Sequence, residues 1–185
     1  MSESTQLFYS DLFKKPNVGT EEQRKDLLDK IHYLKKNNIG VADGSNEGCF
    51  RSTHKYGEEL DWLRDEVANF VQGICKYYME QDKSLEMHMT KQMQQINLSM
   101  WTNVNEPGSI NELHTHKRET FACTYNVQTK GTGNLVFRNP ANILSDCNVK
   151  SPFIRDFEVE PQDGDLLVWP AWVPHLVKRN ESDKQ

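Results

Sequence analysis

The sequence contains no long apolar run, no closely spaced pair of cysteines and no excess of positive charge. No stretch approaches the run of about 20 apolar residues that a membrane-spanning helix needs. The first six residues, MSESTQ, also lack the basic and apolar regions of a secretory signal. We therefore expect a cytoplasmic protein that has no membrane partner.

Charge and cysteine usage exclude two further classes. The formal net charge is −5, and binding to a phosphate backbone needs a basic face, so we do not expect a nucleic-acid partner. Cys49, Cys75, Cys123 and Cys147 are widely spaced with no C-x-x-C motif, which excludes a zinc knuckle and a thioredoxin-like site. The pattern predicts reduced thiols, as is usual in the cytoplasm.

The first part of the chain has helical periodicity. A length of 185 residues suits one domain, 1–185, rather than two. The first twenty residues are expected to form an arm without regular structure. Thr20, followed by two acids and a glutamine, is a helix start signal, and apolar residues recur at helical spacing from Leu27 to Leu34. A second apolar stripe runs from Leu60 to Tyr78, so we expect helices mainly within residues 1–82.

After residue 82 the apolar period changes from 3.6 to 2, which indicates strands in residues 93–185. The turn formers Pro107-Gly108, Asn139-Pro140 and Asp163-Gly164 are expected to link these strands. Many short strands joined by turns predict a mainly β sandwich or barrel. The β-like runs lie at residues 96–100, 121–127, 135–137, 157–159, 166–169 and 176–178.

Three of the six histidines are grouped in the β half, His114 and His116 in an H-x-H motif and His175 in the segment WPAWVPH. In an extended chain, His114 and His116 point to the same face about 6.5 Å apart, close enough to converge on one metal ion. An isolated H-x-H motif is also common at surfaces, so the surrounding pattern decides between these interpretations.

The ordered motifs at residues 100–116, 121–127, 133–137 and 164–175 resemble a family of 2-oxoglutarate and Fe(II)-dependent oxygenases related in fold to prolyl hydroxylases. The resemblance covers about residues 95–183. It implies a double-stranded β-helix, a cupin-like jelly roll, with the N-terminal helices packed on one sheet. It also implies that the strands flanking His114 and His175 lie opposite each other, so that both residues bind one iron.

The third iron ligand departs from the usual pattern, because His116 stands where the wider superfamily has Asp or Glu. One alternative is that His116 is the third ligand, as in cupins with an H-x-H motif. The other is that His116 points elsewhere and a carboxylate such as Glu119, or water, completes the shell. We expect His114, His116 and His175 to be the ligands, with no catalytic residue beyond them.

The resemblance further implies a binding site for the co-substrate 2-oxoglutarate, for which Asn103, Asn111 and Tyr125 are the candidates. Family members carry an Arg after the distal histidine that grips the far carboxylate of 2-oxoglutarate. The 185 residues stop just before its expected position, so the last strand and its Arg are expected to be missing. The nearby cations Lys178, Arg179 and Lys184 are each typical of a solvated surface.

The function we expect is that of an Fe(II)- and 2-oxoglutarate-dependent dioxygenase, an oxidoreductase that hydroxylates an acceptor and converts 2-oxoglutarate to succinate. One alternative is a cupin-like three-histidine metal enzyme that does not use 2-oxoglutarate. Another is a non-catalytic metal- or ligand-binding domain. The sequence leaves open whether the acceptor is a small molecule or a peptide, and whether the protein forms a homodimer.

Overall fold

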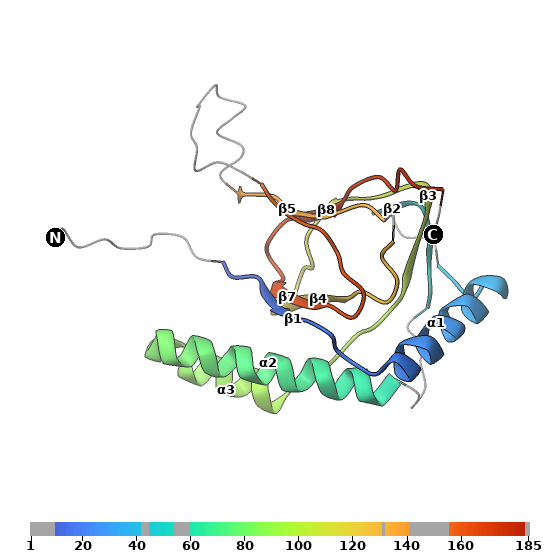
Figure 1. Ribbon diagram of the computed structural model, residues 1–185. Coiled ribbons are helices and arrows are strands. Elements are labelled where there is room, and N and C mark those ends of the chain that lie inside the picture. Colours follow the sequence, from blue (N-terminus) through green and yellow to red (C-terminus); the bar gives the residue numbers. More distant parts are fainter. Residues whose placement is uncertain (1–9, 42–44, 54–59, 131, 141–155, 184–185) are drawn as a thin grey trace, which may run out of the picture.

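Two antiparallel sheets face each other in the computed structural model, which describes residues 10–41, 45–53, 60–130, 132–140 and 156–183. The helices lie against the outer side of one sheet (Figure 1). The helical elements are α1 (Glu21–Lys36), α2 (Asp61–Gln81), the short 3₁₀ helix η2 (Lys83–Leu85) and α3 (Glu86–Gln94). Within the described ranges, none of these helices is both long and apolar enough to cross a membrane.

The strands pair in an order that differs from their order along the chain. The three-stranded sheet has the order β1 (Phe13–Lys15), β7 (Leu166–Pro170), β4 (Phe121–Tyr125). The five-stranded sheet has the order β2 (Asn46–Arg51), β3 (Asn103–His114), β8 (His175–Val177), β5 (Leu135–Phe137), β6 (Phe157–Val159). All of the pairings in both sheets are antiparallel. The prediction of a mainly β double-stranded β-helix is confirmed.

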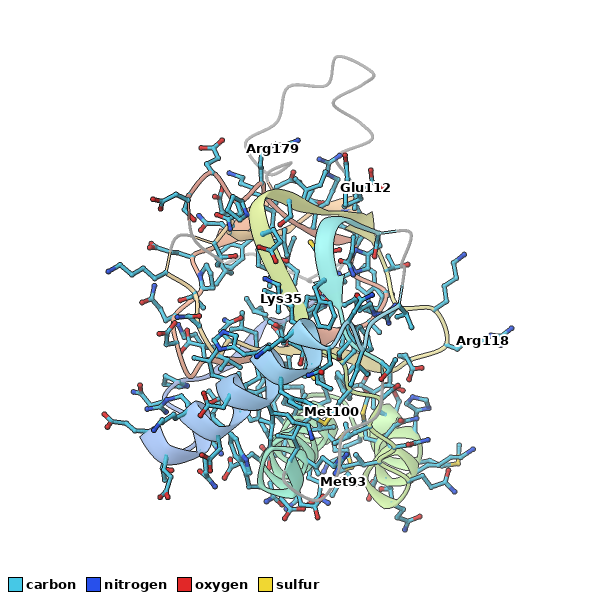
Figure 2. The ribbon with its side chains drawn as sticks, turned by 90° about the vertical axis from the view of Figure 1, so that its right-hand side faces the viewer. Lys35, Met93, Met100, Glu112, Arg118 and Arg179 are labelled. Atoms are coloured by element: carbon cyan, nitrogen blue, oxygen red, sulfur yellow. The ribbon has the colours of Figure 1, made fainter. Side chains whose placement is uncertain are left out.

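Helices α1 and α2 form where the sequence predicts them, and they close the core on one side. Thr20 caps α1 with a complete capping box, since its hydroxyl accepts from the Gln23 backbone and the Gln23 side chain accepts from the Thr20 backbone. The apolar stripe of α2 includes Leu63, Val67 and Ile74, all buried. This stripe packs toward β7, and Met93 and Met100 join the same core near the helices (Figure 2).

Strand β7 separates two cores, because its side chains alternate between its two faces. Leu166 and Val168 face the helices and belong to the helical-side core. Leu167 and Trp169 face the other way and belong to the core between the sheets, which we call the barrel interior. All four of these side chains are at most 3% exposed, so β7 is buried on both faces.

Several local expectations are wrong. Phe13–Lys15, expected to lie in an arm without regular structure, pairs with β7 as β1. A strand, β2, lies within the part expected to be helical, and the whole of α3 lies beyond residue 82. Pro107-Gly108 does not link strands but lies inside β3, where the register against β2 shifts and Gly108 has a φ of 82°. Such a bulge tolerates proline and favours glycine.

The alternating segment from Ile96 to Met100 is not a strand in the structure. Its three apolar side chains, Ile96, Leu98 and Met100, pack against the helical-side core instead. An alternating apolar pattern indicates that one face of a segment is buried, and one face of this segment is buried. A strand must also form hydrogen bonds with a neighbouring strand, and this segment is not paired as a strand. The hydrophobic pattern therefore predicted the burial correctly and the pairing incorrectly.

Candidate metal centre

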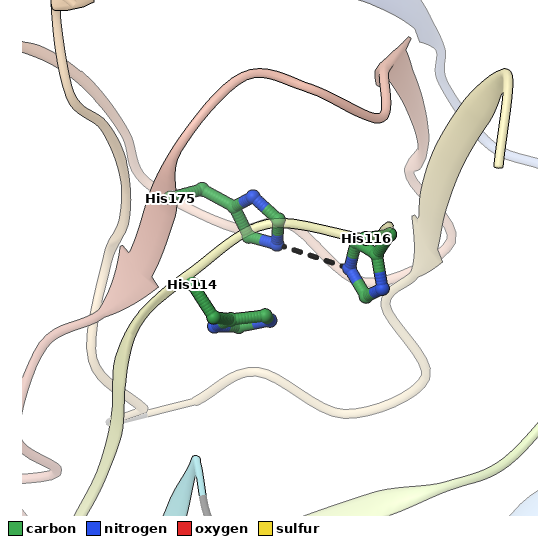
Figure 3. A group of neighbouring side chains, drawn as sticks. All are labelled: His114, His116 and His175. Atoms are coloured by element: carbon green, nitrogen blue, oxygen red, sulfur yellow. Dashed lines mark hydrogen bonds between the residues drawn. The ribbon is translucent and has the colours of Figure 1, made fainter. Parts of the chain in front are cut away.

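Three imidazoles meet at the end of the barrel. His114, His116 and His175 each offer a ring nitrogen, and these three atoms lie within 4.8 Å of one another. The Nε2 atoms of His116 and His175 are 3.2 Å apart, and Figure 3 shows the three rings grouped around one space. The ring centroids of His114 and His175 are 4.3 Å apart. The structure thus brings together the three histidines named from the sequence.

The register of the five-stranded sheet explains this convergence. His114 ends β3 and lies directly opposite His175, the first residue of β8. Opposed residues in an antiparallel pair project to the same face, so these two side chains enter the barrel side by side. His116 follows after β3 ends, where its backbone N–H donates to the Ala171 carbonyl just beyond β7. The link to Ala171 holds His116 between the two sheets.

Backbone carbonyls orient two of the rings. His114 Nδ1 lies 2.7 Å from the Glu112 carbonyl oxygen, and His175 Nδ1 lies 2.9 Å from that of Val173. A carbonyl only accepts, so each Nδ1 carries the hydrogen and each Nε2 keeps a free lone pair. This is the arrangement in which metal-binding histidines are commonly held.

Burial favours the neutral, ligating form of His175. The side chain is 4% exposed. Desolvation is the largest cause that lowers the pKa of His175, to about 4, and the neighbouring His114 and His116 lower it further. The hydrogen bond to Val173 acts in the opposite direction but does not outweigh burial. At neutral pH this imidazole is therefore uncharged and able to bind a cation.

The donor set fits a first-row divalent metal such as Fe(II), for which imidazole is a suitable ligand. Glu119, the alternative third ligand, is exposed and does not belong to the convergent group. His32 lies on α1 and His88 on α3, outside the group, and His54 lies outside the described residues. Among the described residues, the convergent nitrogens come from the three β-half histidines.

Two of the candidate co-substrate residues, Asn103 and Asn111, are both neighbours of a third asparagine, Asn46. Asn46 on β2 lies opposite Asn111 on β3, and its Nδ2 donates to Asn103 Oδ1 at 3.4 Å. Asn111 also lies opposite Val177, two residues from His175 on β8. Because the period of a strand is two, Asn111 shares the inner face with His175. Asn111 Oδ1 is buried and has no hydrogen-bond partner in the described part of the chain.

Tyr125, the third candidate, faces away from the histidines. Its hydroxyl donates to the Val18 carbonyl at 2.7 Å, and its ring packs edge-on against Trp62 at 5.9 Å on the helical side. Burial is the main cause of the raised pKa of Tyr125. Tyr125 thus contributes to the helical-side core rather than to the barrel interior.

The cations near the C-terminus also have other contacts. Lys178 pairs with Glu158 at 2.6 Å, and Arg179, labelled in Figure 2, donates to the Gly108 carbonyl. Lys184 lies outside the described residues. A hollow of about 440 Å³ lies beside Lys178 and Arg179, and the three histidines do not line it.

Trp169 is a residue whose position beside His175 the sequence did not reveal. Its large apolar ring predicts a core position, and the side chain is indeed only 3% exposed. However, its ring lies 4.9 Å from the His175 ring, and its Nε1 has no hydrogen-bond partner among the described residues. The alternation of residues 166–169 predicts that Leu167 and Trp169 lie on the same face of the strand. Only the pairing of the strands shows that this face points into the barrel interior.

The fold and the site define a class, small β-barrel proteins in which three convergent histidines could hold a metal ion. Residues 99–185 match the profile of a family described as "Putative 2OG-Fe(II) oxygenase". This match confirms the resemblance seen in the sequence, and it lies within the β half of the chain.

Comparison with solved structures gives the same fold. A crystal structure of a prolyl-4-hydroxylase from Pseudomonas putida matches with a TM-score of 0.53, over 92% of this chain and 86% of that chain. The sequence identity is 12%, so this likeness shows the fold alone. No curated protein matches the chain in sequence.

Proposed function

We propose that this protein is an Fe(II)- and 2-oxoglutarate-dependent dioxygenase that hydroxylates a small-molecule or peptide acceptor. The observation that carries the proposal is the convergence of His114, His116 and His175, with two rings oriented by backbone carbonyls. The family matched by residues 99–185 supports iron as the metal and 2-oxoglutarate as the co-substrate. When bound, these two groups supply oxygen activation, coupled to the conversion of 2-oxoglutarate to succinate and carbon dioxide.

The residues of this chain would bind and orient these groups. Nε2 of His114, Nε2 of His175 and a ring nitrogen of His116 would hold the metal, and the carbonyls of Glu112 and Val173 would fix the tautomers of His114 and His175. Leu167, Phe137 and other apolar residues of the barrel interior would exclude water from this end of the site. Asn111 would orient the co-substrate from the inner face of β3, through Nδ2 after rotation of its amide, because a carboxylate requires a donor.

The test is succinate formation from 2-oxoglutarate in the presence of Fe(II), oxygen and ascorbate, with and without panels of small-molecule and peptide acceptors. We expect slow succinate release without acceptor, faster release with a correct acceptor, and loss of both in His175→Ala. His88→Ala is the matched control, because it removes an exposed imidazole on α3. If the wild type binds Fe(II) but releases no succinate under any condition, the proposal is wrong.

The third histidine supports a second candidate, a cupin-like metal enzyme that does not use 2-oxoglutarate. Three neutral imidazoles compensate less of the charge of a divalent ion than two imidazoles and a carboxylate do. The two candidates predict different binding: the metal-loaded oxygenase binds 2-oxoglutarate, whereas the cupin-like enzyme does not. Calorimetric titration of the metal-loaded protein with 2-oxoglutarate distinguishes them.

A further inference from the structure

Trp169 presents a buried hydrogen-bond donor to the barrel interior. It lies opposite Ala122 in the pairing of β7 with β4, and both residues belong to the core between the sheets. Trp169 has a relative exposure of 3%. The Nε1 atom has no hydrogen-bond partner in the described part of the chain. A buried donor left without a partner loses its hydrogen bonds to water without replacing them, which destabilises the folded state.

The position of the ring places this donor beside the metal centre. The Trp169 ring lies 4.9 Å from the His175 ring at an angle of 73°, and 5.1 Å from the Phe137 ring at 75°. Phe137 lies opposite His175 in the pairing of β5 with β8. Trp169 therefore approaches His175 from the facing sheet, and it shares the space into which His175 projects.

The other tryptophans have different surroundings. Trp62 packs against Tyr125 on the helical side, and Trp172 is 54% exposed. The Arg51 guanidinium carbon lies 4.5 Å from the centroid of the Trp101 ring. The centroids of the Trp101 and His116 rings are 6.0 Å apart. Only Trp169, among the tryptophans of the described chain, has a buried Nε1 atom without a partner.

We propose that the Trp169 indole N–H binds the co-substrate, by donating a hydrogen bond to one of its oxygen atoms beside His175. The inference rests on the proposed function. An indole nitrogen is a donor only, and 2-oxoglutarate in its ionised form offers only acceptors, so the two are complementary. A hydrogen bond to a charged oxygen in a buried site is stronger than one between neutral groups. The residue assigned by this inference is a binding residue, distinct from the three histidines.

The first experiment observes the N–H group directly in the full chain. The protein is loaded with Zn(II), which has no redox chemistry, and the four indole N–H signals are recorded by ¹H–¹⁵N NMR before and after 2-oxoglutarate is added. We expect the Trp169 signal to shift and its exchange with water to slow, while the Trp62 signal stays in place. Trp169→Phe assigns the signal; if that variant does not fold, Phe variants of the other three tryptophans assign it by elimination.

The second experiment measures affinities in the same metal-loaded state. Trp169→Phe keeps an aromatic ring against His175 but removes the donor, so we expect the Kd for 2-oxoglutarate to rise about tenfold to a hundredfold. The Zn(II) affinity should not change. Trp62→Phe, the matched control on the helical side, should alter neither value.

Three results would overturn the inference, and they are distinguishable. If wild-type protein binds Zn(II) but not 2-oxoglutarate, the proposed function fails and the inference fails with it. If 2-oxoglutarate binds while the Trp169 signal and the Trp169→Phe affinity stay unchanged, only the inference fails. If Trp169→Phe weakens Zn(II) binding as much as co-substrate binding, Trp169 supports His175 and does not bind the co-substrate.

Discussion

The two cores of this protein differ in what they leave unpaired. The helical-side core includes apolar side chains from α1, α2, α3 and β7, and one of its tyrosines, Tyr125, donates to the Val18 carbonyl. The barrel interior is smaller, and it borders three histidines, the unpartnered Trp169 Nε1 and the unpartnered Asn111 Oδ1. The comparison teaches that the helical-side core stabilises the fold, whereas the barrel interior carries polar groups whose burial is expected of the binding site proposed above.

Neighbouring leucines on β7 give the sharpest test of this division. Leu166 faces the helices and Leu167 faces the barrel interior, and each is at most 1% exposed. Either leucine replaced by alanine should lower the free energy of unfolding by about 2–5 kcal/mol, because each leaves a cavity. Denaturant unfolding measures this loss, and metal titration should show that Leu167→Ala weakens the site more than Leu166→Ala. Equal effects on metal affinity would contradict the division into two cores.

His116 tests whether the barrel interior holds the metal with three ligands. His116→Ala should weaken metal binding by more than the 10- to 100-fold that is typical for loss of a group that only orients a ligand. His116→Asp should regain binding, because a carboxylate is a ligand for Fe(II) and compensates its charge. Competition titration with a chelator measures both variants, with His32→Ala on α1 as the control. An unchanged affinity in His116→Ala would exclude His116 as a ligand.

Asn111 allows stability and binding to be separated in a single variant. Its Oδ1 is buried without a partner, so an apolar side chain of similar size should leave the free energy of unfolding unchanged or raise it. Asn111→Leu should nevertheless lower the affinity of the metal-loaded protein for 2-oxoglutarate by about tenfold, as expected for loss of one hydrogen bond to a charged group. Thermal unfolding and calorimetric titration check the two effects. A less stable variant with normal affinity would show that Asn111 is only structural.

The sequence predicted the main elements and the grouping of the three histidines better than the direction of individual side chains. The period change, the Thr20 cap and the H-x-H motif depend on residues close together in the chain, and the structure has helices, strands and convergent histidines there. Tyr125 and Trp169 both lie on alternating strands, but which face is the inner one depends on pairing with strands distant in sequence. The sequence alone therefore could not show that Tyr125 faces the helices, nor that Trp169 lies beside His175. Both depend on the register of β4 and β7.

Tyr125→Phe examines the helical-side core without touching the barrel interior. The variant loses the hydrogen bond to the Val18 carbonyl, which also accepts from Arg24 at 3.2 Å. We expect a loss of about 1 kcal/mol in the free energy of unfolding, the usual net contribution of such a bond. The 2-oxoglutarate affinity should stay that of the wild type, as calorimetry can show. A clear drop in that affinity would restore Tyr125 as a co-substrate residue.

The smallest effect is expected at the solvent-facing edge of the five-stranded sheet, outside both cores. Glu158 on β6 accepts from Lys178 Nζ at 2.6 Å and from Asn134 Nδ2 at 2.8 Å. The hydrogen bond from Lys178, followed by that from Asn134, lowers the pKa of Glu158 below its ordinary value of 4.5. A carboxyl group whose pKa is lowered by folding stabilises the folded state when the pH is above the pKa of the unfolded state. This stabilisation is lost as the pH falls through the pKa of the folded state.

Glu158→Gln should therefore be slightly less stable than the wild type at neutral pH and equally stable once the pH is well below 4.5. Because the pair is exposed, salt should shrink the difference at neutral pH. Thermal unfolding of both proteins across pH 3 to 7, at low and high salt, measures the difference. A difference that persisted in acid would have to come from the geometry of the side chain, because the carboxylate charge would by then be neutralised.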